Sequence, residues 1–372
     1  MKKVLIIGLS LPLLAGILFF VNRYQNNRAT VIPYPFIFPP SQEKIELEAP
    51  ILIIGDRMAA RLDTFKDQLA KKISNNISGQ IKIQTLAGEG QNIHRSLKKL
   101  KSLERLPLVI IFLSNTDENY ESLFAPRNYQ QIVNNLDLYQ DINLQSLLML
   151  FPWLSKLVYS PVNYKELGPT IKPRQTAVPE RLVYKHNEIL FRLYEASFGE
   201  ILQYAKKSTS YVIPVTTPIN LSIPPKSACY GSIDRSYFEE FKEAKALFSK
   251  SDFKGAFNIT KELALLNPYS AEILYLHSRI LYKLNEFSKA HDYGELAVSY
   301  DCGRTGANPI LNEIMKKTAQ KYNFPTFDYH TYLADESTRN SVFIDDIYPQ
   351  DYYLGKLTDI LALKIQKLLK LE

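Results

Sequence analysis

Short apolar runs recur along the chain and alternate with segments of helical periodicity. The run Ile51-Leu52-Ile53-Ile54 stops at Gly55-Asp56-Arg57, and a helical pattern follows over 58–72. Buried strands that alternate with helices predict a parallel sheet with right-handed crossovers, an α/β fold. The other predicted strands are 80–85, 106–113, 211–216 and 325–329. The other predicted helices of this domain are 92–103, 181–207, 308–322 and 354–371.

The segment 237–302 has a different, all-helical pattern with a repeat of 34 residues. Small residues at matching positions let two helices cross closely, and an aromatic residue fills the groove between units. The period and the small-residue positions resemble the tetratricopeptide repeat (TPR). Two units are expected to pack against the rest of the protein, because each such repeat buries its apolar face against a neighbour. The corresponding pairs are Ala244/Ser278, Leu247/Leu281, Phe253/Phe287, Ala256/Ala290 and Leu263/Ala297.

The predicted sheet domain continues on both sides of these repeats, as residues 49–236 and 303–372, so the repeats form an insertion. The two cysteines of the chain, Cys229 and Cys302, bracket the insertion. They come close if its two ends meet, and in an oxidising compartment one such pair makes one disulfide. We expect this disulfide, and two buried free thiols are the alternative.

An unusually apolar piece, Leu147 to Leu154, is too short to span a membrane. We expect it to be a helix packed on the sheet. The alternatives are a lid, or an interfacial segment that lies on a bilayer.

The N-terminus predicts a membrane anchor. Residues 4–21 are 18 residues without charge, preceded by Lys2 and Lys3. The stretch is similar to a secretory signal, but no small-x-small cleavage site follows it, which favours an uncleaved signal-anchor within residues 1–21. We expect a single-pass protein of the bacterial inner membrane, with its bulk on the periplasmic side. Residues 22–48, rich in Asn and Pro, predict a linker.

Composition and charge narrow the possible partners. The chain of 372 residues has a formal net charge of +7. Its basic residues are scattered and form no long block, so nothing favours a nucleic-acid partner. We expect the charge to reflect a solvated surface, and a weak attraction to anionic lipid is the alternative.

Four short motifs, taken in order, resemble those of the SGNH (GDSL-like) hydrolases, particularly bacterial members with inserted TPR units. Gly55-Asp56-Arg57 follows the first strand, and Gly90 lies in a turn after the second. Ser114-Asn115-Thr116-Asp117 follows a buried strand, and Asp345-Asp346-Ile347-Tyr348-Pro349 precedes the last helix. The resemblance covers residues 50–371 and implies a three-layer, flavodoxin-like parallel sheet with a hydrolytic site at its edge.

The departures from that family concern its chemistry. The resemblance places a nucleophilic serine at Arg57, an oxyanion-binding asparagine at Thr116 and a basic histidine at Tyr348; only Gly90 and Asp345 match. A guanidinium is not a nucleophile, and a tyrosine of ordinary pKa is a poor base at neutral pH. Hydrolase chemistry of this kind therefore fails at three independent positions.

Another set of residues could have replaced the lost site. His94 and His330 follow sheet strands and could approach the cleft, whereas His186 lies on a predicted helix. His277 and His291 lie in the repeats and are expected on the surface or in a groove. No serine or cysteine stands beside them in an activating turn. No spacing of ligands predicts a metal, and no cofactor is expected.

Arg57 has two possible roles. It fills the former site by pairing with Asp345, Asp117 or Asp56, which is the expectation. Alternatively, Arg57 and the Gly90 amide bind an anion such as a carboxylate.

These observations predict a membrane-anchored SGNH-like pseudoenzyme that binds a protein or peptide through its TPR-like insertion. The alternatives are an active esterase, or an O-acyl hydrolase or transferase, that acts on envelope glycans with relocated catalytic groups, and a purely structural envelope component.

Overall fold

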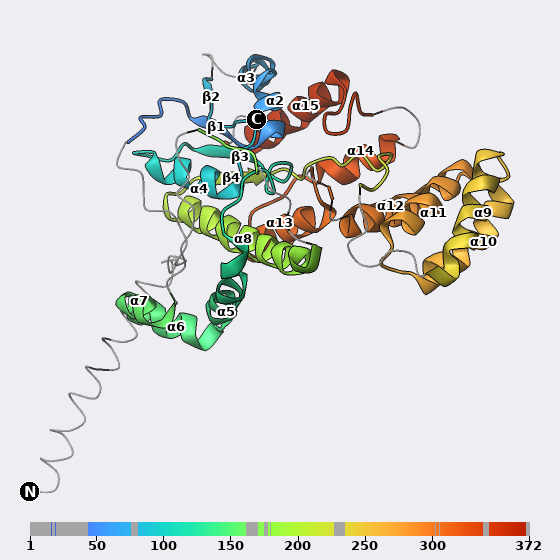
Figure 1. The fold of residues 1–372 in the computed structure, drawn as a ribbon. Helices are drawn as coiled ribbons and strands as arrows, with labels where there is room; N and C mark the ends of the chain where they lie inside the picture. The colour runs from blue at the N-terminus through green and yellow to red at the C-terminus, as the bar shows by residue number, and fades with distance from the viewer. Residues whose placement is uncertain are drawn as a thin grey trace, which may run out of the picture.

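The computed structural model describes residues 44–75, 81–160, 170–174, 178, 180–226, 235–301, 303–304, 306–337 and 342–369, together with Gly16 and Phe19. Its centre is a parallel sheet of four strands in the order β2-β1-β3-β4 (Figure 1). The strands are β1 (Ile51–Gly55), β2 (Ile83–Thr85), β3 (Val109–Leu113) and β4 (Tyr211–Pro214). The α/β class expected from the apolar runs is confirmed.

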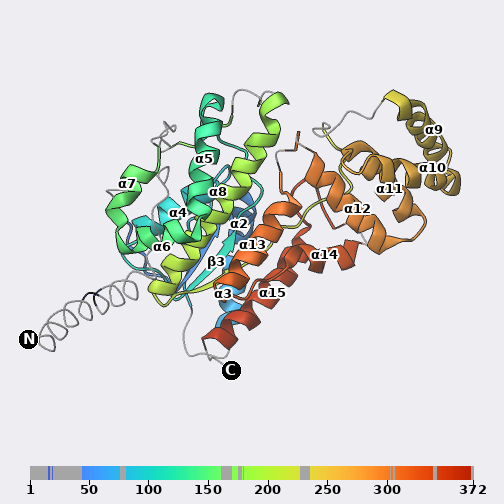
Figure 2. The same cartoon turned by 90° about the horizontal axis from the view of Figure 1, so that it is seen from below.

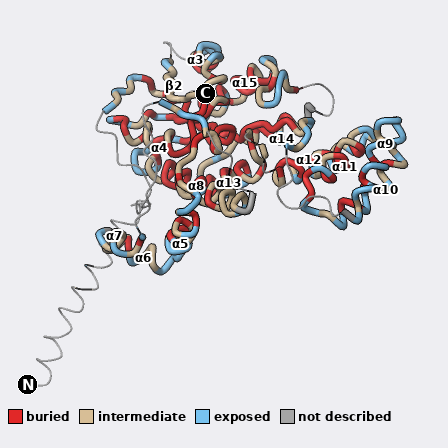
Figure 3. The backbone as a smooth tube through the Cα atoms, in the orientation of Figure 1, coloured by how far each residue is buried: buried red, intermediate tan, exposed pale blue. Residues whose placement is uncertain are grey.

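The central strands are apolar on both faces because helices cover both sides of the sheet (Figures 2 and 3). Ile51 and Ile53 of β1 pack on one side, and Leu52 and Ile54 pack on the other. The first layer consists of α2 (Arg57–Asp63), α3 (Lys66–Ser74), α14 (Tyr329–Ser337) and α15 (Asp351–Leu368). The second consists of α4 (Ile93–Ser102), α8 (Glu180–Lys207) and α13 (Pro309–Lys321).

Two elements of this domain differ from the prediction. The helix expected over 58–72 is interrupted, because the Thr64 hydroxyl donates to the Arg61 carbonyl (2.8 Å) and ends α2 before α3 begins. The fifth strand expected over 325–329 is only a single parallel bridge between Val215 and Phe327. The chain leaves the sheet there because it enters α14 at Tyr329.

The apolar segment around Leu147–Leu154 does not pack on the sheet, so that expectation is wrong. It forms α6 (Ile142–Leu150), the 3-10 turn η2 (Pro152–Leu154) and α7 (Ser155–Val158). These follow the short turn η1 (Pro126–Asn128) and α5 (Tyr129–Gln140), and they project from the body beside α5 (Figures 1 and 2). The sheet has no room for them, because both of its faces are already covered.

The insertion consists of the turn η3 (Arg235–Tyr237) and four helices at the opposite end of the molecule (Figures 1 and 2). They are α9 (Phe238–Ser249), α10 (Phe253–Leu266), α11 (Ala271–Lys283) and α12 (Phe287–Tyr300). Ala244, Ala256, Leu263 and Ala297, all singled out by the 34-residue spacing, are buried in their common core. Helices α13 to α15 then return to the two layers of the sheet domain.

Several predictions lie outside the described residues. Cys229 and Cys302 are among these, as is nearly all of the 4–21 anchor. Within the described ranges, no helix combines the length and the apolar character that a membrane crossing requires.

Candidate functional site

The candidate site lies where the carboxyl ends of β1 and β3 meet. The chain continues from β1 to β2 at one side and from β3 to β4 at the other. The crossovers after β1 and β3 therefore lead in opposite directions along the sheet. Open parallel sheets place their ligand sites at such switch points. Gly55 permits the close approach of the two strands, because a Cβ there would lie 1.5 Å from the Leu113 carbonyl oxygen.

Asp56 holds the two loops together. Its Oδ1 accepts from the Met58 amide (2.9 Å) and caps α2. Its Oδ2 accepts from the Asn115 (2.7 Å) and Thr116 (2.5 Å) amides of the loop after β3. Burial, followed by the negative charge of Asp117, raises the pKa of Asp56. These bonds give Asp56 a structural role.

Asp117, the last residue of the third motif, occupies the centre of the site. Its Oδ2 accepts from two backbone amides, that of Gly90 (2.8 Å) and that of Arg57 (3.2 Å). Its Oδ1 accepts from Arg57 Nε (2.7 Å) and also pairs with Arg57 Nη2. The Asp117 side chain is completely buried. Of the three carboxylates considered for Arg57, Asp117 is therefore the one that pairs with it.

This arrangement is a filled anion site. Two converging backbone amides and a guanidinium are the donor set that binds oxyanions. All of these donors point at the molecule's own carboxylate. Burial alone lowers the pKa of Arg57, but the hydrogen bonds and charge of Asp117 outweigh it and raise that pKa. An external anion would therefore have to displace Asp117.

Two further side chains cover the pair. The Tyr120 ring lies over the Arg57 guanidinium, with 5.7 Å from Cζ to the ring centre. Gly90 has a φ of +75°, and a Cβ there would lie 2.7 Å from Ile171 and 2.8 Å from Tyr120. Gly90 is thus required both by its backbone conformation and by this close covering. Arg57 keeps only 16% of its side chain exposed.

The remaining motif residues lie at or beside the site. Tyr348 lies close enough to Arg57 to interact with its charge. Burial raises the pKa of Tyr348, which keeps its hydroxyl protonated at neutral pH. The exposed Asp345 accepts from the Ile347 (2.7 Å) and Tyr348 (2.6 Å) amides of its own turn. Thr116 contributes its amide to Asp56.

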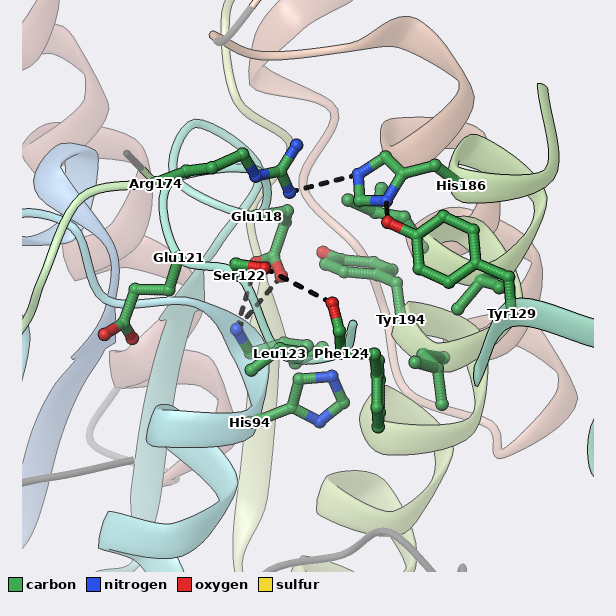
Figure 4. Close-up of a pocket in the computed structure, with 14 residues that line it drawn as sticks. His94, Glu118, Glu121, Ser122, Leu123, Phe124, Tyr129, Arg174, His186 and Tyr194 are labelled. Atoms are coloured by element: carbon green, nitrogen blue, oxygen red, sulfur yellow. Dashed lines mark hydrogen bonds between the residues drawn. The ribbon is translucent and has the colours of Figure 1, made fainter. Parts of the chain in front are cut away.

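A small cavity with mostly apolar walls and a few buried polar side chains lies next to the site, and the sequence pattern did not predict it (Figure 4). Its volume is about 30 Å³, enough for one or two water molecules. Glu118, which follows Asp117 directly, accepts from the Ser114 hydroxyl (2.5 Å) and the Ile93 amide (3.1 Å). Burial raises the pKa of Glu118 to about 8. The sequence signal was a second acidic residue directly after the third motif.

Two of the five histidines line this cavity. His186 contacts the Tyr129 hydroxyl through Nδ1 (2.9 Å) and Asn119 Oδ1 through Nε2 (2.9 Å). Burial and the charge of Arg174 lower its pKa to about 3. His94 lies 3.1 Å from the Ser197 hydroxyl, and burial lowers its pKa to about 4. Both imidazoles are therefore neutral at neutral pH.

The other three histidines belong to the insertion and its junction with the body. His277 is buried in the insertion and contacts the Thr260 hydroxyl (2.9 Å), so the expectation of a surface or groove position is wrong for this residue. His291 and Glu295 of α12 meet His330 of α14, and their ligand atoms all lie within 4.8 Å of one another.

This trio is the cluster in the described part of the chain that could hold a metal, but its hydrogen bonds oppose that role. His330 Nδ1 accepts from the Ile219 amide (3.2 Å), so Nε2 carries the proton and donates to Glu295 (2.7 Å). A histidine that binds a metal through Nε2 normally has a proton on Nδ1 and donates it. The cluster is better explained as a polar contact between the insertion and the body.

The fold and the site define an α/β protein of the doubly wound class with a filled polar centre at its switch point. No protein-family model and no curated protein matches the chain. Among solved structures, the chain is similar to a "putative acylhydrolase" from Bacteroides fragilis, with a TM-score of 0.35 and 10% identity. The similarity covers 92% of this chain and 98% of the other. A likeness this low supports no statement about the activity of this chain.

Proposed function

We propose that this chain is a membrane-anchored, extracytoplasmic SGNH-like pseudoenzyme that acts by binding or scaffolding. The observation that carries the proposal is the position of the Asp117 carboxylate, which engages the amides of Arg57 and Gly90 and the Arg57 guanidinium. A transition-state oxyanion needs free donors, and here a fixed negative charge occupies them. Arg57 supplies no nucleophile, and the protonated Tyr348 supplies no base.

An esterase assay with the full-length chain in detergent tests the catalytic part of this proposal. Wild type, Arg57→Ala and Arg57→Ser are each expected to hydrolyse p-nitrophenyl acetate no faster than buffer. Arg57→Ser restores a hydroxyl at the family's serine position but leaves Asp117 on the donors. Turnover by wild type that is lost in Arg57→Ala would overturn the proposal.

The insertion is the proposed partner surface. At the end of α10 and in the turn before α11, Leu265 (69%), Leu266 (59%) and Tyr269 (57%) are largely exposed. Adjacent exposed apolar side chains at one helix end and in the turn after it favour a protein or peptide partner. This surface lies at the end of the molecule opposite α6 and α7 (Figure 1).

Affinity capture separates a binding protein from a structural envelope component. Tagged full-length chain would be compared with Leu265→Ser/Tyr269→Ser and with Leu363→Ser, a matched exposed leucine on α15. A partner retained by wild type and Leu363→Ser but lost from the double variant supports the binding role. Identical capture by all three contradicts it.

The pair of Ser197 and His94 favours a second candidate, an esterase with relocated groups. Their 3.1 Å contact is compatible with activation of a hydroxyl by an imidazole. However, Ser197 lies in the middle of α8 and is only 2% exposed, which leaves no approach for an acyl substrate. Any esterase activity that disappears in Ser197→Ala would favour this candidate over the first.

A further inference from the structure

The projecting hairpin of α6, η2 and α7 exposes several large apolar side chains. Ile142 is 79% exposed, Leu157 75%, Trp153 62% and Leu147 44%. Isolated exposed leucines are normal on protein surfaces, whereas such a group within one short hairpin marks an interaction site. This face is the strongest candidate for an unassigned function in the described part of the chain.

The composition of the hairpin indicates what it contacts. Residues 142–158 contain one charged residue, Lys156, and no acidic residue. By contrast, α15 also exposes Tyr352 and Leu363, but it places Asp351, Lys356, Asp359, Lys364 and Lys367 among them. Tryptophan is enriched at membrane–water interfaces, and a group of exposed leucine, isoleucine and tryptophan side chains without an acidic neighbour suits insertion at the boundary of headgroups and acyl chains.

The packing of the hairpin leaves this face free. Leu148 and Tyr159 form a small buried cluster with half-buried neighbours, including Tyr139 of α5. The hairpin therefore has its own internal support and extends from the body, away from the sheet (Figures 1 and 2). It does not need the exposed side chains for its own core.

We propose that the exposed face of α6, η2 and α7 docks on the surface of the bilayer that anchors the chain. This inference rests on the membrane anchor in the proposed function. Residues 22–43 join the predicted span to the described body, and 22 extended residues reach at most about 75 Å. The tether keeps the bilayer at a high effective concentration, so a weak interfacial contact is sufficient.

Trp153 provides the test because it is the single tryptophan of the chain. Full-length protein would be reconstituted in vesicles of phosphatidylcholine and phosphatidylglycerol, with and without bromine on the acyl chains. Wild type is expected to show a blue-shifted emission that brominated lipid quenches. Ile142→Ser/Leu157→Ser is expected to lose the shift and the quenching, whereas the matched control Leu265→Ser/Leu363→Ser keeps both.

Flotation of the same vesicles separates this inference from the proposed anchor. Protein that floats while Trp153 remains unquenched overturns the docking proposal and leaves the anchor intact. Protein that does not float overturns both. A blue shift that depends on protein concentration in detergent, without quenching by lipid, assigns the face to a second copy and also overturns the proposal. Equal unfolding midpoints in detergent for both double variants exclude misfolding as the cause.

Discussion

The Asp117 carboxylate is fully buried, and within the described residues it accepts hydrogen bonds from Arg57 and Gly90. Removing one partner of a buried charge pair leaves the other charge uncompensated, which is more costly than the net value of the pair. Asp117 therefore stabilises the loops at the carboxyl ends of β1 and β3. Under the proposed function, the carboxylate that occupies the donors of this site is also the group that holds these loops together.

Asp117→Ala is expected to lower the free energy of unfolding by about 3 kcal/mol, because Arg57 and two amides lose their acceptor. Sodium formate should recover part of the lost free energy of unfolding, since a small carboxylate can accept from the donors that Asp117 occupied. Denaturant unfolding with formate, and with chloride at equal ionic strength, measures both effects. Asp345→Ala, which removes an exposed carboxylate, serves as the control. A variant that is destabilised but insensitive to formate contradicts the anion-site interpretation.

Glu118→Gln tests the buried acid beside the site. Burial raises the Glu118 pKa from 4.5 to about 8, so the folded state keeps a proton that the unfolded state releases. The Glu118 contribution to stability is therefore lost as pH rises from about 4.5 towards 8. The free energy of unfolding of Glu118→Gln, relative to that of wild type, should therefore rise by on the order of 3 kcal/mol between pH 5 and pH 8.

Urea unfolding at several pH values measures this difference directly. Glu262→Gln on the exposed face of α10 is the matched control, since its side chain is solvated in the folded and unfolded states. A difference between Glu118→Gln and wild type that stays constant with pH contradicts the expected protonation.

The sequence could predict the place of Arg57 but not its partner. The order of the motifs placed Asp56, Asp117 and Asp345 in the same site. Only the geometry of the loops shows which of these carboxylates pairs with Arg57. Asp56 is directed to the amides after β3, and Asp345 to its own turn. Such choices depend on the relative placement of two strand ends, which a linear pattern does not contain.

Among the elements, patterns with a defined periodicity predicted the structure best. The 34-residue spacing identified buried positions of α9 to α12, and the apolar runs identified β1 and β3. The prediction that the apolar segment of α6 packs on the sheet was wrong, because hydrophobicity alone does not indicate what an apolar helix packs against. The fifth strand was overpredicted because a single bridge at Phe327 and a full strand produce the same short apolar pattern.

The junction between α12 and α14 is expected to fix the insertion on the body. His330 links Glu295 of α12 (2.7 Å) to the Ile219 amide (3.2 Å). His330→Ala should lower the stability that this contact contributes by about 1 to 3 kcal/mol, because the buried Ile219 amide loses its acceptor. Hydrogen exchange should show faster exchange at Ile219 and along α12. Lys289→Ala, which breaks a surface pair with Glu286, should leave both unchanged. Unaltered exchange in His330→Ala would show that apolar packing alone holds the insertion.

At the scale of the whole molecule, the two exposed apolar surfaces lie at opposite ends. The hairpin of α6 and α7 extends from one end of the sheet domain, and the insertion extends from the other (Figures 1 and 2). With the hairpin on the bilayer, the insertion points away from the membrane. Under the two proposals, the sheet domain with its filled site separates the surface that lies on the bilayer from the surface that binds a partner.

Energy transfer to the bilayer tests this orientation. An azide-bearing residue at Asn143, an exposed polar position of the hairpin, or at Leu265 accepts a donor dye without involving the cysteines, and the vesicles carry an acceptor on their headgroups. Because transfer falls steeply with distance, the donor at Asn143 should lose most of its emission and the donor at Leu265 should retain it. Adding Ile142→Ser to each labelled chain should reduce the difference, since the body then moves freely on its tether. Equal transfer at both positions in the unsubstituted chain would mean that the molecule lies flat or tumbles, and that the insertion has no fixed direction relative to the membrane.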